Sequence, residues 1–277
     1  MLTADLIAAL RCPACHGPLR DEAGLKCPRG HNFDLAKQGY AHLGTGARLP
    51  AGDTAEMVVA REAVQSAGLF APLEAALVPL VPEPARLIVD LGAGTGHYLS
   101  RILQDRPHAH GLAFDVSKSA LRRAARAHER MGAVLADTWG PLPLADSSAD
   151  VILNVFAPRN GPEMLRVLRA GGVLIVATPT AAHLRELRDK ARLLDVDPSK
   201  QERLGVTLAG FRRTGEHTVR WRLDLSAAQA DSLILMGPNA FHGFTATGPI
   251  VTRAEVSVTT WTGRPLPSHP GDRGWDR

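Results

Sequence analysis

The sequence contains few cysteines and no long hydrophobic stretch. Its 277 residues include three cysteines, all within the first 27 positions. This excludes a disulfide framework and favours metal ligands or redox groups in a reduced compartment. The longest apolar runs, such as RLIVDLGAG and GGVLIVATP, are too short to cross a bilayer. The N-terminus lacks the basic region of a signal peptide and carries Asp5. We therefore expect a cytoplasmic protein without a membrane span.

A strong charge of either sign is also absent. The net charge of +4 is only a mild lean toward a polyanionic partner. A composition rich in Arg and poor in Lys could produce that basicity by itself, so charge does not decide the function. No internal repeat is present. The length allows one large α/β domain with a small appendage.

The cysteines form two short clusters, and the second is closed by a histidine. Cys12, Cys15, Cys27 and His31 follow the spacing C-x2-C-x11-C-x3-H, with Pro and Gly beside the ligands to form sharp turns. His16 directly follows Cys15 and cannot easily reach the same ion, so His31 is the preferred fourth ligand. Three thiolates and one imidazole form a closed tetrahedral set typical of structural Zn2+. The alternative is three free thiols beside an unrelated histidine.

A glycine-rich turn follows an apolar run at residues 87–91. Gly92, Gly94 and Gly96 come after Asp90 and precede a helical pattern, which indicates a strand, a tight turn and a helix N-terminus. The dinucleotide fingerprint requires a third glycine where this chain has His97. The pattern D-x-G-x-G-x-G is instead typical of S-adenosylmethionine-dependent methyltransferases, although a bare structural turn or a nicotinamide site remains an alternative.

The strands that follow end in acids at the expected positions. A second strand ends at Asp115, where a carboxylate can accept both ribose hydroxyls, and a third is followed by Asp137, which could accept from the adenine amino group. A fourth strand is expected at residues 151–156 and a fifth after Gly171 and Gly172. The alternating segments 217–225 and 251–261 predict an antiparallel pair that closes the sheet edge.

These elements predict an α/β, Rossmann-like class I methyltransferase sheet with a small N-terminal Cys3His zinc-binding domain. The expected division is a zinc domain at 1–45, a methyltransferase domain at 46–262, and a disordered tail at 263–277. A Gly-rich connector and two helices between Thr54 and Leu80 lead into the sheet. The span from Lys190 to Arg213 fits either an RNA-facing insertion or a loop with a short helix.

Several phrases together resemble one family. They are the Cys3His stretch followed by HNFDLAKQGYAHL, then GDTAEMVVAREAVQSAGLFAPL, DLGAGTGHY, FDVSK, ATPTAAHLREL and MGPNAFH. Over about residues 10 to 262 the chain resembles the 23S ribosomal RNA (guanine-N1)-methyltransferases of the RlmA type. The resemblance implies a homodimer that binds an rRNA hairpin and methylates guanine 745 or 748 in helix 35 of domain II. Methylation at 748 is associated with resistance to tylosin-type and mycinamicin-type macrolides, and the phrase MGP leans toward the 748-type members.

The resemblance also implies roles for single residues. It places the zinc ligands on Cys12, Cys15, Cys27 and His31, and the methyl-donor contacts on Asp90, Gly92, Gly94, Asp115, Asp137 and Asn154, with His183 in the phrase HLREL. The glycine pattern adds Gly96, so that the predicted donor turn, the turn that would hold the methyl donor, contains Gly92, Gly94 and Gly96. Some relatives have an aromatic pair with Trp after MTP, whereas this chain has MGPNAFH. Phe241 and His242 would therefore supply any stacking surface.

Methylation of guanine N1 requires loss of the N1 proton, and the sequence offers three candidate bases, Asp53, Glu56 and His183. Asp53 could equally cap the helix that begins at Thr54. The predicted turn from Asn154 to Pro158 faces the donor methyl.

Arginines are the expected RNA contacts. Arg122, Arg126 and Arg130 have the spacing of one helix face, and Arg11, Arg20 and Arg29 lie near the metal ligands. The helix stripe could equally be a solvated surface.

Two other functions share parts of this pattern. One is a small-molecule methyltransferase of secondary metabolism, against which the zinc module argues. The other is a non-catalytic RNA-binding assembly factor, against which the complete set of Asp90, Gly92, Gly94 and Asp115 argues. The sequence alone does not choose between guanines 745 and 748, or between a housekeeping and a self-resistance role.

Overall fold

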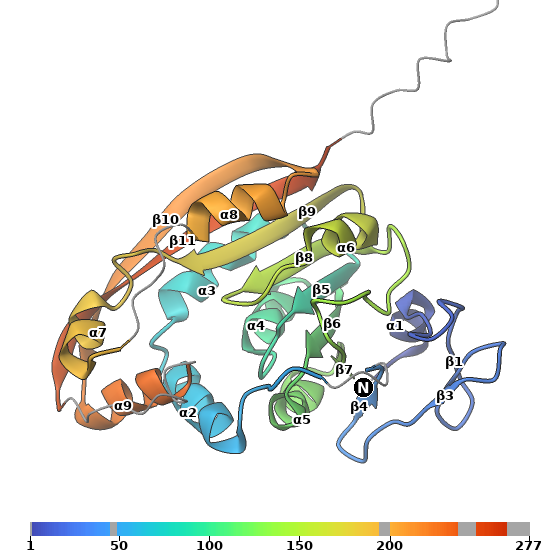
Figure 1. The fold of residues 1–277 in the computed structure, drawn as a ribbon, viewed down its shortest axis with the longest axis horizontal. Helices are drawn as coiled ribbons and strands as arrows, with labels where there is room; N and C mark the ends of the chain where they lie inside the picture. Colours follow the sequence, from blue (N-terminus) through green and yellow to red (C-terminus); the bar gives the residue numbers. More distant parts are fainter. Residues whose placement is uncertain (1, 45–48, 194–199, 238–247, 265–277) are drawn as a thin grey trace, which may run out of the picture.

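The computed structural model describes residues 2–44, 49–193, 200–237 and 248–264. An eight-stranded sheet in the order β10-β11-β9-β8-β5-β6-β7-β4 runs through the molecule (Figure 1). Its strands are β4 (Tyr40–His42), β5 (Leu87–Leu91), β6 (His110–Asp115), β7 (Met131–Leu135), β8 (Ala149–Val155), β9 (Leu168–Pro179), β10 (Phe211–Leu225) and β11 (Ile250–Gly263). The predicted α/β class is confirmed.

The centre of the sheet is parallel and one edge is antiparallel. Strand β5 pairs in parallel with both β6 and β8, so the direction of winding reverses beside it. In such sheets ligands bind at the carboxyl ends of the strands on either side of this point. Strand β11 pairs antiparallel with β9 and β10, as the alternating segments predicted. The polar residues after β5, β6 and β8 therefore meet at one edge of the sheet.

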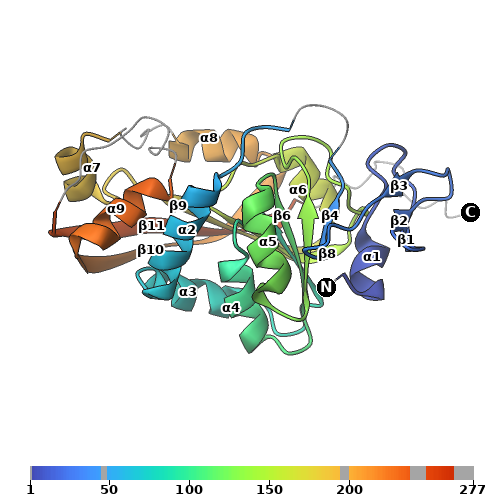
Figure 2. The same ribbon diagram turned by 90° about the horizontal axis from the view of Figure 1, so that it is seen from below.

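Helices cover both faces of the sheet (Figure 2). One buried cluster joins the sheet to α3, α4, α5, α7 and α9, and a second joins its opposite face to α1, α6 and α8. The helices are α1 (Ala4–Ala9), α2 (Ala55–Ser66), α3 (Ala71–Leu77), the 3-10 turn η1 (Val78–Leu80), α4 (His97–Asp105), α5 (Lys118–Ala127), α6 (Gly161–Val167), α7 (Arg185–Ala191), α8 (Lys200–Thr207) and α9 (Ala227–Leu235). The two helices expected between Thr54 and Leu80 are present as α2 and α3 with η1.

The N-terminal segment is joined to the main sheet. Its small sheet contains β1 (Arg20–Asp21), β2 (Leu25–Lys26) and β3 (Asn32–Phe33), but β4 pairs in parallel with β7. The side chains of Leu2 and Leu6 in turn pack against the open side of Gly132 in β7. The main sheet therefore includes residues before 45, and the expected domain division there stays a prediction.

The expected ambiguous span contains helical structure. Helix α7 ends at Ala191, α8 follows from Lys200, and β10 begins at Phe211. Residues 45–48 of the connector and 265–277 of the expected tail lie outside the described residues. Within the four described ranges, no single helix is long and apolar enough to span a membrane; only the pair of α2 with α3–η1, bent by 79°, meets that test.

Candidate functional site

The four predicted metal ligands lie together in the N-terminal segment. Their ligand atoms are all within 4.8 Å of one another. His31 Nδ1 is 3.4 Å from Cys12 Sγ and 3.3 Å from Cys27 Sγ, and Cys15 Sγ is 3.6 Å from Cys27 Sγ. Tetrahedral zinc with bonds of about 2.0–2.3 Å holds neighbouring donors roughly 3.5–3.8 Å apart. The donor set therefore fits Zn2+, which would supply a structural cross-link.

Local turns direct the ligands inward. The His16 N–H donates to the Cys12 carbonyl over 2.8 Å, and the Gly30 N–H donates to the Cys27 carbonyl over 2.9 Å. Burial opposes ionisation of Cys27, but hydrogen bonds from the backbone and from neighbouring ligands lower its pKa to about 6. The exposed His16 ring lies instead 4.0 Å from Asp146. The structure thus groups His31, and not His16, with the cysteines.

We expect that the Cys12→Ala variant loses its bound zinc and has a lower melting temperature than the wild type. Cys12 and Cys27 belong to the same buried cluster as Leu142 and Leu144 of the main body, so loosening the ligand turns should also weaken that core. Metal analysis of the purified proteins, combined with thermal unfolding, tests this. His16→Ala is the matched control and should keep about one zinc per chain. Full zinc occupancy in Cys12→Ala would contradict the assignment.

The glycine-rich turn connects β5 to α4 with three left-handed residues. Gly92, Gly94 and Gly96 have φ values of 79°, 56° and 77°. A Cβ on Gly92 would lie 2.4 Å from the Cβ of Ala157, so glycine is needed where this turn meets the turn after β8. A Cβ on Gly94 would instead meet the Arg61 side chain at 3.7 Å. Gly92 thus serves close packing, while Gly94 lies beside the Arg61 side chain.

Two predicted acids lie at the ends of neighbouring strands. The Asp115 carboxylate accepts hydrogen bonds from the Gly94 and Ser117 N–H groups, each over 2.8 Å. Asp90 is buried at 2 % exposure. Its burial, together with the nearby charge of Asp115, raises the pKa of Asp90 to about 8. Asp90 and Gly92 also line a narrow cavity together with Arg61, Phe70 and Phe156.

The other two predicted donor contacts differ in position. Asp137 lies just beyond β7, and its Oδ1 accepts from the Trp139 N–H over 2.9 Å. Asn154 is fully buried, and its Nδ2 donates to the carbonyls of Leu91 and Pro158 over 3.1 and 2.8 Å. Asn154 therefore fixes the turn after β8 to the end of β5.

The structure separates Asp53 and Glu56, two of the candidate bases. Thr54 caps α2 by accepting from the Met57 N–H over 3.2 Å, so the alternative that Asp53 caps this helix is wrong. Asp53 instead pairs with Arg61 at 2.5 Å. Glu56 is exposed in the first turn of α2, where a negative charge stabilises the helix dipole.

His183, the third candidate, is held as a neutral ring. Its Nδ1 accepts from the Glu255 N–H over 3.2 Å, which leaves the ring proton on Nε2. Removal of the ring from water, with a contribution from the charge of Arg188, lowers the pKa of His183 to about 4. A neutral imidazole with its acceptor nitrogen occupied is a poor proton acceptor.

Arg61 and Phe156 are site residues that the sequence analysis missed. Arg61 Nη2 donates to Asp53 and, over 2.8 Å, to the Met236 carbonyl, while its buried Nε has no partner among the described atoms. The signal for Arg61 was weak because a single arginine on an amphipathic helix usually faces water. Phe156 was included in the turn after β8 but not singled out as a site residue.

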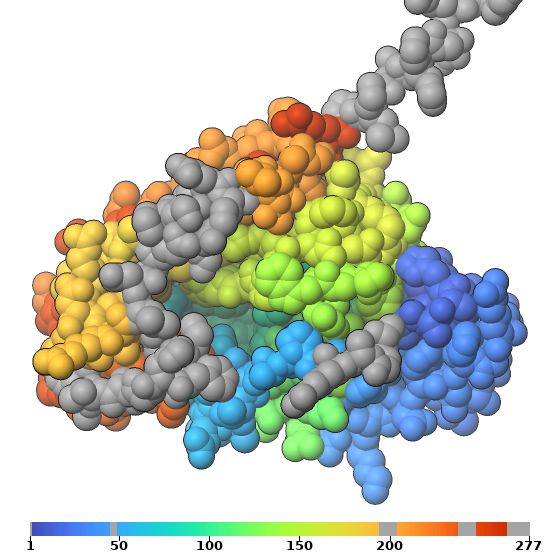
Figure 3. Space-filling model, viewed as in Figure 1, coloured from blue at the N-terminus to red at the C-terminus, as the bar shows by residue number. Residues whose placement is uncertain are grey.

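The hollow above this pocket is visible on the molecular surface. In Figure 3 the light-blue residues that lead into α2 and the green residues above them flank deeper teal residues. The hollow lies at the carboxyl edge of the central strands, where the fold predicts a ligand.

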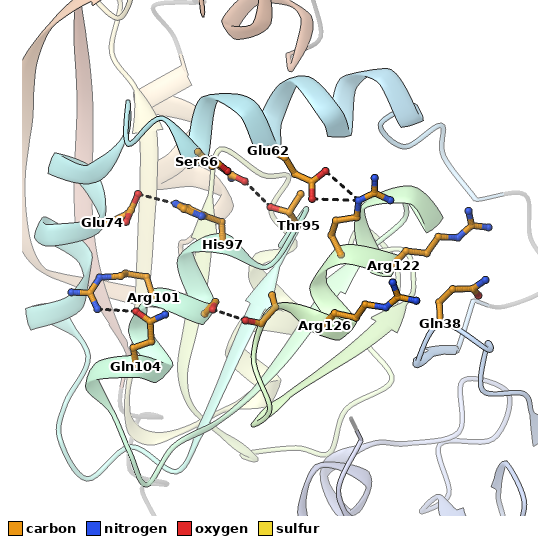
Figure 4. Close-up of a pocket in the computed structure, with 14 residues that line it drawn as sticks. Gln38, Glu62, Ser66, Glu74, Thr95, His97, Arg101, Gln104, Arg122 and Arg126 are labelled. Carbon is orange, nitrogen blue, oxygen red and sulfur yellow. Dashed lines mark hydrogen bonds and ion pairs between the residues drawn. The ribbon is translucent and has the colours of Figure 1, made fainter.

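A larger groove of about 780 Å3 lies outside this pocket, between α2, α4 and α5. Its acids are engaged, because Glu74 contacts His97 at 2.8 Å and Glu62 contacts Arg123 at 3.2 Å. Arg122 and Arg126 project from α5 toward the side chain of Gln38, from the N-terminal segment (Figure 4). Both arginines are exposed. The groove therefore presents two positive charges beside the zinc-binding segment.

The predicted arginine stripe is wrong in its third member. Helix α5 ends at Ala127, and Arg130 donates to the carbonyls of Leu103 and Arg106 at the end of α4 and to that of Ala109 directly before β6. This is the interaction of a cation with the unpaired carbonyls of a helix C-terminus. The expected stacking residues Phe241 and His242 lie outside the described residues.

The fold and the donor turn define a class I S-adenosylmethionine-dependent methyltransferase. Two family models match the chain, one described as RlmA, N-terminal, at residues 10–45, and one described as Methyltransferase domain, at residues 83–215. A protein of Micromonospora griseorubida named as a 23S rRNA (guanine-N1)-methyltransferase is 50 % identical over 92 % of each chain. The chain belongs to this family of 23S rRNA (guanine-N1)-methyltransferases.

One further relative and one solved structure are also similar to this chain. The 23S rRNA (guanine(748)-N(1))-methyltransferase of Streptomyces fradiae is 42 % identical, covering 95 % of this chain and 99 % of that protein. Among solved structures, a chain from the complex of the Haloferax volcanii Trm112 methyltransferase activator with a methyltransferase has a TM-score of 0.50 at 16 % identity. That alignment covers 77 % of this chain and 99 % of the solved one. This last likeness supports the fold alone.

Proposed function

We propose that this chain transfers a methyl group from S-adenosylmethionine to N1 of guanine 748 in helix 35 of 23S rRNA. The observation that carries the proposal is the near full-length similarity to the Streptomyces fradiae enzyme named for that guanine. Guanine 745 is the alternative target. We further propose that the protein acts in the cytoplasm as a homodimer and confers resistance to tylosin-type or mycinamicin-type macrolides.

The donor would occupy the carboxyl edge of β5 and β6. Gly92 and Gly94 let the backbone approach it closely, and Asp115 would accept from its ribose hydroxyls. Asp137 lies where it could accept from the adenine amino group. Gly96 would act indirectly, because a Cβ there would meet Met131 Sδ of β7 at 2.8 Å and Ala124 of α5 at 3.2 Å.

Arg61 is proposed to hold the carboxylate of the donor. Its guanidinium lies in the cavity that Asp90 and Gly92 line, and its Nε has no partner within the described part of the chain. A planar guanidinium matches a carboxylate by two parallel hydrogen bonds. The pair with Asp53 would keep the side chain in place before the donor binds.

Catalysis would depend mainly on holding guanine N1 in line with the donor methyl. S-adenosylmethionine supplies an activated methyl group when it is bound. Of the candidate bases, Asp53 contacts Arg61 of the donor pocket, whereas Glu56 is exposed at the start of α2 and the acceptor nitrogen of His183 is already occupied. It is therefore the favoured acceptor of the N1 proton, ahead of Glu56 and His183.

The RNA hairpin would contact the zinc-binding segment and the adjacent groove. Arg20 and Arg29 are exposed on that segment, and Arg122 and Arg126 lie on the neighbouring face of α5. Ion pairs with phosphates would make RNA binding weaken as salt is added. Shape and unstacked loop bases would supply the specificity.

Labelled methyl transfer to undermethylated 23S rRNA, followed by primer extension, tests the function. The proposal expects incorporation that maps to N1 of guanine 748. A stop at guanine 745 would correct the target within the same family. Donor binding without any transfer to rRNA would favour a small-molecule methyltransferase, and RNA binding without donor binding would favour an assembly factor.

A further inference from the structure

Phe156 has an unusual conformation at the carboxyl edge of the sheet, where the methyl donor is proposed to bind. It is the first residue after β8, and its φ of 55° is in the left-handed region that side chains other than glycine and asparagine seldom adopt. Phe156 is also 37 % exposed, although it is a large apolar residue. Such strain persists only where the surrounding structure imposes it, and it clusters at functional sites.

The neighbouring residues impose this conformation. The Phe156 N–H donates to the Ala177 carbonyl over 3.0 Å. Asn154 holds the Pro158 carbonyl from the other side, and Ala157 packs into the space that Gly92 leaves open. The backbone of the turn is therefore fixed at three points, and it leaves Phe156 partly exposed at the rim of the core.

Two other rings, those of Phe70 and His183, pack against the ring of Phe156. The Phe156 ring centroid lies 6.1 Å from that of Phe70, in an edge-to-face arrangement, and 6.0 Å from that of His183. Phe70 in turn packs edge to face against Trp221 at 5.5 Å. Phe70 is 2 % exposed, so the aromatic core is complete without further burial of Phe156. The ring of Phe156 is therefore held in place by its neighbours, while part of the residue stays exposed.

We propose that Phe156 is the stacking platform for the target purine, which it holds against the donor pocket after the base leaves the RNA stack. Phe156 lines the same cavity as Asp90 and Gly92, so a base on its ring lies beside the donor. Proteins read unstacked RNA bases by stacking them on aromatic rings, and enzymes that modify a base must take it out of the stack. The inference rests on the proposed function and adds a residue to the roles assigned to Phe241 and His242.

The test compares Phe156→Leu, which keeps an apolar side chain but removes the flat ring, with Phe156→Tyr, which keeps the ring. The substrate is a helix 35 hairpin, and both the kinetic constants for RNA and the affinity for S-adenosylmethionine are measured. We expect kcat/KM for RNA to fall about 10- to 100-fold in the leucine variant. Donor affinity should stay near the wild-type value, and the tyrosine variant should keep most of the activity. Val251→Ala removes exposed apolar surface elsewhere and is the matched control.

A second readout follows the base directly. With 2-aminopurine in place of the target guanine, wild-type protein should change the fluorescence of the hairpin, and Phe156→Leu should not. Equal kinetics in the leucine variant and the wild type would overturn the inference while leaving the proposed function intact. Equal loss of donor and RNA affinity would also overturn it, because Phe156 would then support only the donor pocket. Failure of the wild type to methylate the hairpin or rRNA would count against the proposed function itself.

Discussion

Replacing Asp90 by Asn should stabilise the fold at neutral pH and nearly abolish methyl transfer. The Asp90 carboxyl is buried beside Asp115, and this raises its pKa to about 8. In the unfolded chain the same group ionises near its ordinary value of 3.8. Folding therefore requires Asp90 to take up a proton at any pH between these two values.

The sign of the pH dependence follows from this difference. A group whose pKa is raised by folding favours the folded state fully below its unfolded pKa, and that contribution is lost as pH rises through the folded pKa. Each pH unit between about 4 and 8 costs at most about 1.4 kcal/mol. Asparagine has the same shape without this cost. The stabilising effect of Asp90→Asn should thus be small at pH 4 and largest near pH 8.

The same substitution should lower activity, although it raises stability. The donor carries a sulfonium cation, which an ionised Asp90 favours, so donor affinity in the wild type should rise with pH up to about 8. Asp90→Asn should lose this pH dependence and reduce kcat/KM by about 100-fold, because a buried charge partner is removed. Buried catalytic groups commonly reduce stability in this way.

Thermal unfolding and donor titration between pH 5 and 9 measure both effects. Asp105→Asn is the matched control, because Asp105 is an acid at the exposed end of α4 that pairs with Arg101 at 3.2 Å. We expect the control to show no gain in melting temperature that grows with pH. If Asp90→Asn melted at a lower temperature than the wild type at pH 7, burial of the Asp90 carboxyl would not be destabilising and this interpretation would be wrong.

The metal ligands and the donor turn were predictable because local spacing determines them. Two pairs of ligands on sharp turns define a cluster, and the structure brings Cys12 and His31 together as expected. Asp90 and Asp115 precede turns at the ends of buried strands, so the topology of a parallel sheet places them at one edge. The antiparallel pair of β10 and β11 was likewise visible in the alternation of apolar residues.

The missed features depend on contacts between distant residues. Strand β4 has three residues and no alternation that could reveal its pairing with β7. The buried amide of Asn154 holds the turn through Pro158, a structural contact that the sequence did not reveal, while its contact with the methyl donor stays a prediction. The left-handed conformation of Phe156 follows from the way the turn packs on Gly92, which no local pattern encodes.

Replacing Arg61 by Ala should weaken S-adenosylmethionine binding about 10- to 100-fold, as expected for loss of hydrogen bonds to a charged group. The same change should leave the affinity for 5′-methylthioadenosine nearly unaltered, because that ligand has the adenosine and the sulfur but no carboxylate. Arg61→Lys keeps the charge but not the planar pair of donors, so its affinity should be intermediate. Calorimetric titration of both ligands measures the difference.

The comparison between the two ligands separates recognition from support of the pocket. Arg61 also contacts Asp53 and the carbonyl of Met236, the residue that ends α9. Its removal could therefore loosen α2 and the end of α9 even if Arg61 did not bind the ligand directly. In that case both ligands would weaken together, and the carboxylate assignment would be wrong. Arg123→Ala is the control, since Arg123 pairs with Glu62 on the outer side of α2 and does not line the donor pocket. Selective loss of S-adenosylmethionine binding, with the control unchanged, would leave recognition of the carboxylate by Arg61 as the explanation that fits an Nε without a partner among the described residues.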